Sequence, residues 1–356
     1  MTNHNGRIDV HHHIIPPAFT ATMDRKGIKE VAGAPLPSWT PQKSLSIMDA
    51  IGTQTALLSL SAPGVYFGSV PDACALARAC NEYAADVARQ HFGRFGFFAV
   101  LPMPFTEHAC REAIYALDTL RADGIVLLGS TEGVFLGDTS LEELMAELDR
   151  RKAVVFVHPN MHATSTTIEL SAPGYLLEFL PDTTRAALNL IISGTMERYP
   201  DIRWILAHAG GFLPYIAWRL SLGNFIRDIV AKAPQGIMHY IKRFYFDTAL
   251  SPSPYAMMPL KELVGASQVL FGSDFPFAPA AISHLEATTL DSSLVWDNAE
   301  KTQIMRGNAT CLFPQYRTDS DRIIELPSYT RETLGQRLKR SLRSPIISMA
   351  EYMQKR

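Results

Sequence analysis

The chain has 356 residues, of which 47% are hydrophobic and 19% are charged, and its formal net charge is −2. This composition is globular and can fill the core of one barrel domain or of two smaller domains. The charge gives no broad electrostatic reason to bind nucleic acid or an anionic membrane, and no apolar run reaches the eighteen residues of a spanning helix.

The beginning of the chain has no signal-peptide core, and the cysteines form no C-x-x-C pair. We therefore expect buried thiols rather than disulfides or metal ligands at the four cysteines, Cys74, Cys80, Cys110 and Cys311. The expectation is a soluble protein of the cytoplasm.

A strand is expected over residues 7–13, a run that ends in His11, His12 and His13. Side chains on a strand point to opposite faces in turn, so His11 and His13 share one face and His12 lies on the other. Two neighbouring imidazoles at a strand end are a natural pair of ligands for zinc or a similar ion. A pair of hydrogen-bonded core histidines is the alternative.

An irregular stretch from Pro16 to Pro41 follows, and after it strands and helices alternate. Further strands are expected over 54–61, 95–101, 124–128, 154–157, 203–207, 244–247 and 269–271. Helices are expected over 44–51, 71–91, 106–121, about 139–151, 183–199, 213–231, 256–265 and 298–311. Thr139 or Ser140 is the expected cap of the fourth of these helices. The strands are near-continuous apolar runs, which is typical of strands buried on both faces.

Eight strand–helix units predict an α/β fold, a (β/α)8 TIM barrel with a long first loop. A doubly wound protein of two domains is the structural alternative. Residues 1–313 are expected to form the barrel domain. Residues 314–356, which include a basic run at Arg337, Lys339, Arg340 and Arg343, are expected to form an extension that packs on the barrel or on a partner subunit.

Polar residues follow the predicted strands where the active site of such a barrel lies, at the carboxyl ends. They are His11, His13, His158, His208 and Asp274. Each alone could be a hydrogen-bonded core residue or a cap, but five residues placed alike favour a metal site. Three imidazoles and one carboxylate would leave a position for water or substrate, and the fifth residue could act as base or proton relay.

The segments around these residues resemble the amidohydrolase superfamily, in the branch around aminocarboxymuconate semialdehyde decarboxylase. The carrying motifs are Ile8-Asp-Val-His-His-His13, Phe156-Val-His-Pro159, Ala207-His-Ala-Gly-Gly-Phe-Leu-Pro214 and Phe271-Gly-Ser-Asp-Phe-Pro276. The resemblance implies that one divalent metal, zinc or sometimes manganese, is held by His11, His13, His158 and Asp274. It also implies that His208 stays off the metal and manages the proton.

Two departures from the superfamily pattern narrow the resemblance. Binuclear hydrolases place a carboxylated lysine at the end of the fourth strand, where this chain has Val126-Leu-Leu-Gly129. The semialdehyde decarboxylases carry arginines after a Trp-x-Pro, where this chain has Trp39-Thr-Pro-Gln-Lys43. This stretch looks more like 6-methylsalicylate decarboxylases, which take a monocarboxylic ortho-hydroxy aromatic acid.

The resemblance also implies a substrate site. Arg219, eleven residues after His208, matches an arginine that reaches into a neighbouring subunit, so a homodimer or higher oligomer is expected; a helix-surface salt bridge is the alternative. Phe212, Phe275 and Phe277 could line an aromatic pocket or pack in the core.

The expected reaction is non-oxidative decarboxylation of an acid such as 6-methylsalicylate, which releases CO2 and a phenol such as 3-methylphenol. Either water relayed by His208 or Asp274 itself could donate the proton. The alternatives are a mononuclear hydrolase of a lactone or amide, and a binding scaffold without catalytic metal.

Overall fold

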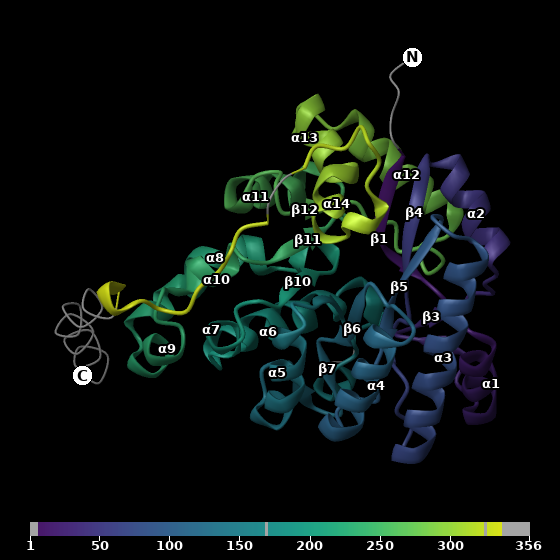
Figure 1. Cartoon of the computed structure of the whole chain (residues 1–356), viewed down its shortest axis with the longest axis horizontal. Coiled ribbons are helices and arrows are strands. Elements are labelled where there is room, and N and C mark those ends of the chain that lie inside the picture. The colour runs from purple at the N-terminus through teal and green to yellow at the C-terminus, as the bar shows by residue number, and fades with distance from the viewer. Residues whose placement is uncertain (1–5, 168–169, 324–325, 337–356) are drawn as a thin grey trace.

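The computed structural model describes residues 6–167, 170–323 and 326–336, and its main feature is one barrel of parallel strands (Figure 1). The strands follow one another around the barrel in chain order. They are β1 (Arg7–His13), β4 (Thr53–Ser59), β5 (Phe95–Val100), β6 (Gly124–Leu128), β9 (Val154–His158), β10 (Arg203–Leu206), β11 (Tyr245–Asp247) and β12 (Val269–Leu270). Between the last strand and the first, Val10 N–H donates to Phe271 O at 2.9 Å and His12 bridges to Phe275. The predicted TIM barrel is confirmed.

Helices surround this barrel. They are α1 (Pro17–Lys26), α2 (Pro41–Ala50), α3 (Val70–Gln90), α4 (Thr106–Asp118), α5 (Glu142–Arg150), α6 (Phe179–Ile192), α7 (Thr195–Arg198), α8 (Leu213–Ser221), α9 (Arg227–Lys232), α10 (Ile237–Ile241), α11 (Pro254–Val264), α12 (Ala280–Ser292), α13 (Asn298–Thr302) and α14 (Asn308–Leu312). The longer helices, such as α3, α4 and α6, bury one apolar face. Inside the barrel, Phe98 packs on Phe156 with ring centroids 5.5 Å apart. This packed interior leaves the carboxyl ends of the strands as the place for a site.

The prediction of an irregular stretch from Pro16 to Pro41 is wrong in part, because this stretch contains α1 and the hairpin of β2 (Glu30–Val31) and β3 (Ala34–Pro35). Pro17 stands at the first helical position of α1, where a missing N–H costs nothing. Helix α12 and the short α10 were not predicted at all. A second small hairpin, β7 (Ser130–Thr131) with β8 (Val134–Phe135), follows β6.

Three predicted helices are interrupted. The helix expected over 183–199 breaks at Gly194, which adopts φ +81° between α6 and α7. The helix over 213–231 divides into α8 and α9, and the helix over 298–311 contains a π-helical turn at Gln303–Gly307. The cap expected at Thr139 or Ser140 is wrong, because these residues lie in a 3-10 turn, Thr139–Leu141, that leads into α5. Asp138 caps this turn, and its carboxylate accepts from Ser140 N–H at 2.8 Å.

After α14 the described part of the tail returns to the barrel wall. Arg331 donates to Arg198 O and Glu332 N–H donates to Glu197, each at 2.6 Å, so residues 326–336 lie against α7. The basic run from Arg337 to Arg343 lies outside the described residues. Among the residues that the structure describes, no helix combines the length and apolarity needed to cross a membrane.

Candidate metal centre

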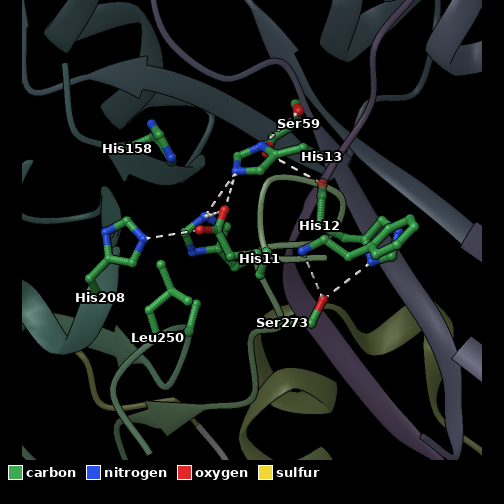
Figure 2. A network of polar contacts seen from close by, with 12 residues as sticks. His11, His12, His13, Ser59, His158, His208, Leu250 and Ser273 are labelled. Carbon is green, nitrogen blue, oxygen red and sulfur yellow. Dashed lines mark hydrogen bonds and ion pairs between the residues drawn. The ribbon is translucent and has the colours of Figure 1, made fainter. Parts of the chain in front are cut away.

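Four side chains from three parts of the chain meet at the carboxyl end of the barrel (Figure 2). His11 and His13 come from β1, His158 ends β9, and Asp274 follows β12. One ligand atom from each residue lies within 4.8 Å of the others, and all four residues are buried. The structure thus brings together the four residues that the resemblance implies as metal ligands.

Each imidazole is oriented by a hydrogen bond on its outer nitrogen. Nδ1 of His11 lies 2.7 Å from Asp247 Oδ2, Nδ1 of His13 lies 3.1 Å from Ser59 O, and Nδ1 of His158 lies 2.8 Å from Pro159 O. Each of these oxygens accepts from Nδ1 and so directs the Nε2 of its ring toward the cluster, where Nε2 would offer its lone pair to a bound metal ion. Metal-binding histidines in proteins are arranged in this way.

Asp274 faces the histidines from the opposite side of the cluster. Its Oδ1 lies 2.9 Å from His13 Nε2 and 3.3 Å from His11 Nε2. Burial raises the pKa of Asp274, but His11 and the hydrogen bonds from both histidines outweigh burial and hold that pKa well below its ordinary value. Its backbone adopts φ +53°, and its N–H donates to His11 O at 2.8 Å, which fixes the carboxylate beside β1.

The charges of the cluster fit a bound cation. Burial lowers the pKa of His11, but the carboxylates of Asp247 and Asp274 outweigh burial and raise this pKa to about 10. Burial and the neighbouring histidines lower the pKa of His158 well below its ordinary value, so this ring is a neutral donor. Two buried carboxylates therefore demand positive charge, while the imidazoles offer lone pairs to it. Three nitrogen donors and one carboxylate are a donor set that zinc accepts.

His208 lies at the edge of this cluster and not among the four donors. Its Nε2 is 3.7 Å from Asp274 Oδ2, beyond hydrogen-bond reach. Within the described chain neither of its ring nitrogens has a hydrogen-bond partner, although both are buried. Its backbone adopts φ +54° and its N–H donates to Asp247 Oδ1 at 2.8 Å. The ring is therefore held in place with two nitrogens available to a ligand or a proton.

His12 points away from the cluster, as the alternation along β1 predicts. Its Nδ1 lies 3.0 Å from Asp9 and its Nε2 lies 2.8 Å from Ser44 Oγ, which also accepts from Trp39. Trp39 and Ser44 belong to the stretch that looks like 6-methylsalicylate decarboxylases. They therefore support β1 on the side that faces away from the cluster. Lys43 from the same segment is exposed and donates to Ser38.

The end of β6 leaves no room for a bridging lysine. A Cβ atom on Gly129 would lie 2.4 Å from the carboxylate of Asp182. Asp182 is fully buried and accepts from Ser130 Oγ at 2.6 Å and from Asn160 N–H at 2.8 Å, so it is fixed there. This arrangement fits a centre with one metal ion.

The residues predicted to bind substrate lie at different distances from the cluster. Phe277 contacts His13 edge-on with ring centroids 5.3 Å apart, and Phe212 is 37% exposed on the segment after His208. Phe275 is buried behind the cluster against His12. Arg219 is exposed on α8, and it makes no ion pair with any residue that the structure describes.

Sequence reasoning missed Asp247, which binds both His11 and the backbone of His208. The signal was present, because Asp247 follows Phe244-Tyr-Phe246 as His158 follows its own apolar run. It also missed Leu250 and Glu286, which meet near the site only through the fold. No local pattern around these two residues indicates that contact.

Two cavities bear on the location of the site. A small apolar hollow at the ends of β4, β5 and β6 is lined by Val100, Val126 and Leu128, and Leu128 is the register partner of His158. A larger cavity of about 550 Å³ lies between α1 and α3 and is lined by none of the cluster residues. The first hollow is also lined by none of the four cluster residues, but through Leu128 it lies beside the strand that ends in His158.

Comparisons with known proteins agree with this geometry. Residues 8–315 match the model of the amidohydrolase family. The chain is 40% identical over 329 residues to decarboxylase yanB of Aspergillus niger, covering 88% of this chain and 89% of that protein. It is 36% identical over 321 residues to 6-methylsalicylic acid decarboxylase of Penicillium expansum, covering 87% and 97%.

Solved structures share the fold. The crystal structure of an amidohydrolase II has a TM-score of 0.82 with 30% identity, covering 86% of this chain and 99% of that one. The dihydroxybenzoic acid decarboxylase of Polaromonas sp. JS666, with bound manganese and the inhibitor 2-nitroresorcinol, has a TM-score of 0.76 with 25% identity, covering 88% and 98%.

Proposed function

The chain belongs to the amidohydrolase family, and from this membership we propose that it is a metal-dependent, non-oxidative decarboxylase of an ortho-hydroxy aromatic acid. The substrate is 6-methylsalicylate or a close analogue, and the products are CO2 and a phenol such as 3-methylphenol. The observation that carries this proposal is the identity of 36–40%, over nearly the whole chain, with decarboxylases that include one named for 6-methylsalicylic acid. The cluster beside His208 supplies the chemistry that such a reaction needs.

The metal is held by His11, His13, His158 and Asp274 in this proposal, and zinc is the ion that we assign. Three imidazole nitrogens favour zinc over a hard ion such as Mg²⁺, although the same set also accepts manganese. When bound, the ion supplies positive charge for the carboxylate and the phenolic oxygen of the acid. Elemental analysis of the purified protein tests the assignment.

His208 delivers the proton in the mechanism that we propose. The ring carbon that bears the carboxylate gains a proton, and the electron pair of the carbon–carbon bond returns to the ring as CO2 leaves. Neither nitrogen of His208 has a hydrogen-bond partner among the described residues, and Nε2 lies 3.7 Å from the Asp274 carboxylate at the edge of the cluster, as a proton carrier requires. Asp274 is ionised in the site, which suits a ligand better than an acid.

The substrate class is supported by what surrounds the cluster. Val100, Val126 and Leu128 form an apolar wall beside the strand that ends in His158, and we assign the hydrocarbon edge of the ring to this side of the cluster. Lys43 is the positively charged residue in the stretch Trp39–Lys43. Its side chain donates to Ser38 and is exposed to solvent. A second carboxylate on the substrate would thus find no partner in this wall or in Lys43, which favours a monocarboxylic acid.

Incubation of the metal-loaded protein with salicylate-type acids, followed by detection of the phenol, tests the reaction. We expect 3-methylphenol from 6-methylsalicylate and no product after treatment with a chelator. Activity on lactones or amides, with no turnover of any aromatic acid, would show that the chain is instead the mononuclear hydrolase.

A homodimer is the assembly that we propose, with Arg219 acting in the site of the partner copy. Tyr215 and Trp218, which are 84% and 77% exposed, flank Arg219 on α8. Helix α8 packs on α11, whose Tyr255 and Met258 are also exposed. Exposed aromatic side chains of this kind are typical of protein–protein interfaces.

Mixing two inactive variants tests whether Arg219 acts across subunits. We expect Arg219→Ala and His208→Asn each to lose most activity. Co-expressed in equal amounts, they should regain about a quarter of the unmodified activity, because half of the dimers contain one intact site. Arg185→Ala, on the exposed face of α6, is the matched control. No recovery in verified heterodimers would contradict a role in trans.

The cytoplasm is the location that we propose. Cys74, Cys80 and Cys110 are free thiols, and Cys80 and Cys311 are buried, as expected for a reducing compartment. Fractionation of cells that produce the full chain tests this location.

A further inference from the structure

The loop after β11 connects the candidate site to a carboxyl group that the mechanism does not use. Asp247, at the end of β11, holds His11 and the backbone of His208, and it also accepts from Ala249 N–H at 3.1 Å. The next residue is Leu250, which adopts φ +52°. This left-handed conformation is rare for a residue with a branched side chain and persists only where the surroundings impose it.

Glu286 imposes the conformation of Leu250. Its side chain reaches from α12, is buried, and accepts the Leu250 N–H. Burial and the negative charge of Asp274 raise the pKa of Glu286 to about 9, so at neutral pH it accepts as an uncharged carboxylic acid. Its second oxygen is buried and has no partner among the described residues.

Leu250 places an apolar side chain at the site. Figure 2 shows its side chain directed toward the space between His208 and His11. The side chain is 47% exposed, whereas the preceding residues, Thr248 and Ala249, are buried. The rare backbone conformation therefore presents a leucine to the same space in which a substrate would meet His208.

The chemistry of the proposed reaction indicates which part of the substrate Leu250 contacts. His208 must lie close to the carbon that bears the carboxylate, since that carbon receives the proton. The phenolic oxygen on one side of this carbon faces the cation site, so the ortho substituent on the other side is left beside His208. Leu250 is the apolar group that the figure places there.

We infer that Leu250 is a specificity-determining residue that contacts the ortho substituent of the aromatic acid, and that Glu286 is its positioning residue. This inference rests on the proposed function and adds to it the residue that selects a methyl over a hydroxyl substituent. A leucine side chain stabilises a methyl group by burial and leaves a hydroxyl without a hydrogen-bond partner. One such difference in a pocket changes kcat/KM by about tenfold or more.

The test compares two acids, 6-methylsalicylate and 2,6-dihydroxybenzoate, on the full-length, metal-loaded enzyme and its variants. Leu250→Asn keeps a residue that tolerates positive φ but makes the contact polar. We expect the preference for the methyl compound, measured as the ratio of kcat/KM values, to fall about tenfold, mainly through KM. Leu250→Gly also suits this backbone and should lower the preference as well.

Glu286 has two informative variants and the loop has a matched control. Glu286→Gln keeps a neutral acceptor for the Leu250 N–H and should keep the preference, whereas Glu286→Leu removes the acceptor and should lower it. Leu285→Asn, on the same helix with a side chain that is 59% exposed, should change nothing. A merely structural role would lower thermal stability without changing the preference between substrates.

Calorimetric binding of both acids separates this inference from the proposed function. If the unmodified enzyme binds the acids without turnover, the proposed reaction fails, and the affinity ratio of Leu250→Asn still tests the contact. An unchanged ratio in folded, metal-loaded Leu250→Asn and Leu250→Gly would overturn the inference, as would an unmodified protein that binds neither acid.

Discussion

Two buried side chains at opposite ends of the barrel, Arg306 and His208, differ in how far their polar atoms are hydrogen-bonded. At the amino end, buried Arg306 donates to Asp321 at 2.7 Å, to Gly6 O at 3.0 Å and to Tyr316 O at 2.8 Å. At the carboxyl end, both ring nitrogens of His208 are without hydrogen-bond partners among the described residues, and the backbones of His208, Leu250 and Asp274 adopt positive φ. Unpaired buried groups and left-handed residues cost folding free energy. We therefore contrast the stabilising network around Arg306 at the amino end with the reactive cluster beside His208 at the carboxyl end.

The largest expected effect is a loss of activity in a variant at the carboxyl end of the barrel. His208→Asn removes the proton carrier, and we expect kcat to fall by about 10²–10⁴. The metal content should not change, because His208 is not among the four donors. The melting temperature should stay about the same, since the imidazole makes no hydrogen bond that the variant would lose. Turnover and melting are measured on the same preparation, and an unchanged kcat would exclude His208 from the chemistry.

The carboxyl end was the part of the fold that the sequence predicted best. Strands buried on both faces are continuous apolar runs, so a polar residue that ends one, such as His158 or Asp274, is visible without a structure. The same rule would have found Asp247. Helix α12 was missed because Ala280–Ser292 mixes small and polar residues with little periodicity. The contact between Glu286 and Leu250 joins residues 36 positions apart and depends on how α12 packs.

The second prediction concerns the amino end and its dependence on pH. Burial raises the pKa of Asp321, but the Arg306 guanidinium and the bonds from Thr318 lower it from 3.8 to about 2. A depressed carboxyl pKa stabilises the fold fully above pH 3.8, and this contribution is lost as the pH falls through 2. Asp321→Asn should therefore lose about 2 kcal/mol of unfolding free energy at pH 7. Its deficit relative to the unmodified chain should shrink below about pH 4.

Urea unfolding of both chains between pH 3 and pH 7 measures this difference. The rate constant for decarboxylation per metal-loaded molecule should be the same for Asp321→Asn and the unmodified enzyme. A deficit that does not change with pH would mean that the Arg306–Asp321 ion pair is not its cause.

The smallest expected effect comes from a single hydroxyl at the amino end. Tyr316 donates to both oxygens of Asp123 at 3.0 Å, and Asp123 also accepts from Phe97 N–H at 2.8 Å. Tyr316→Phe removes one donor from a buried carboxyl that keeps its other bonds, so we expect a loss of about 1 kcal/mol. Tyr115→Phe, which removes an exposed bond to Glu82, is the control and should change stability by less than about 0.5 kcal/mol. Thermal melting measures both effects, while KM for the aromatic acid should not move in either variant. A change in KM for Tyr316→Phe would show that the two ends of the barrel are coupled, and the division between a stabilising end and a reactive end would then be wrong.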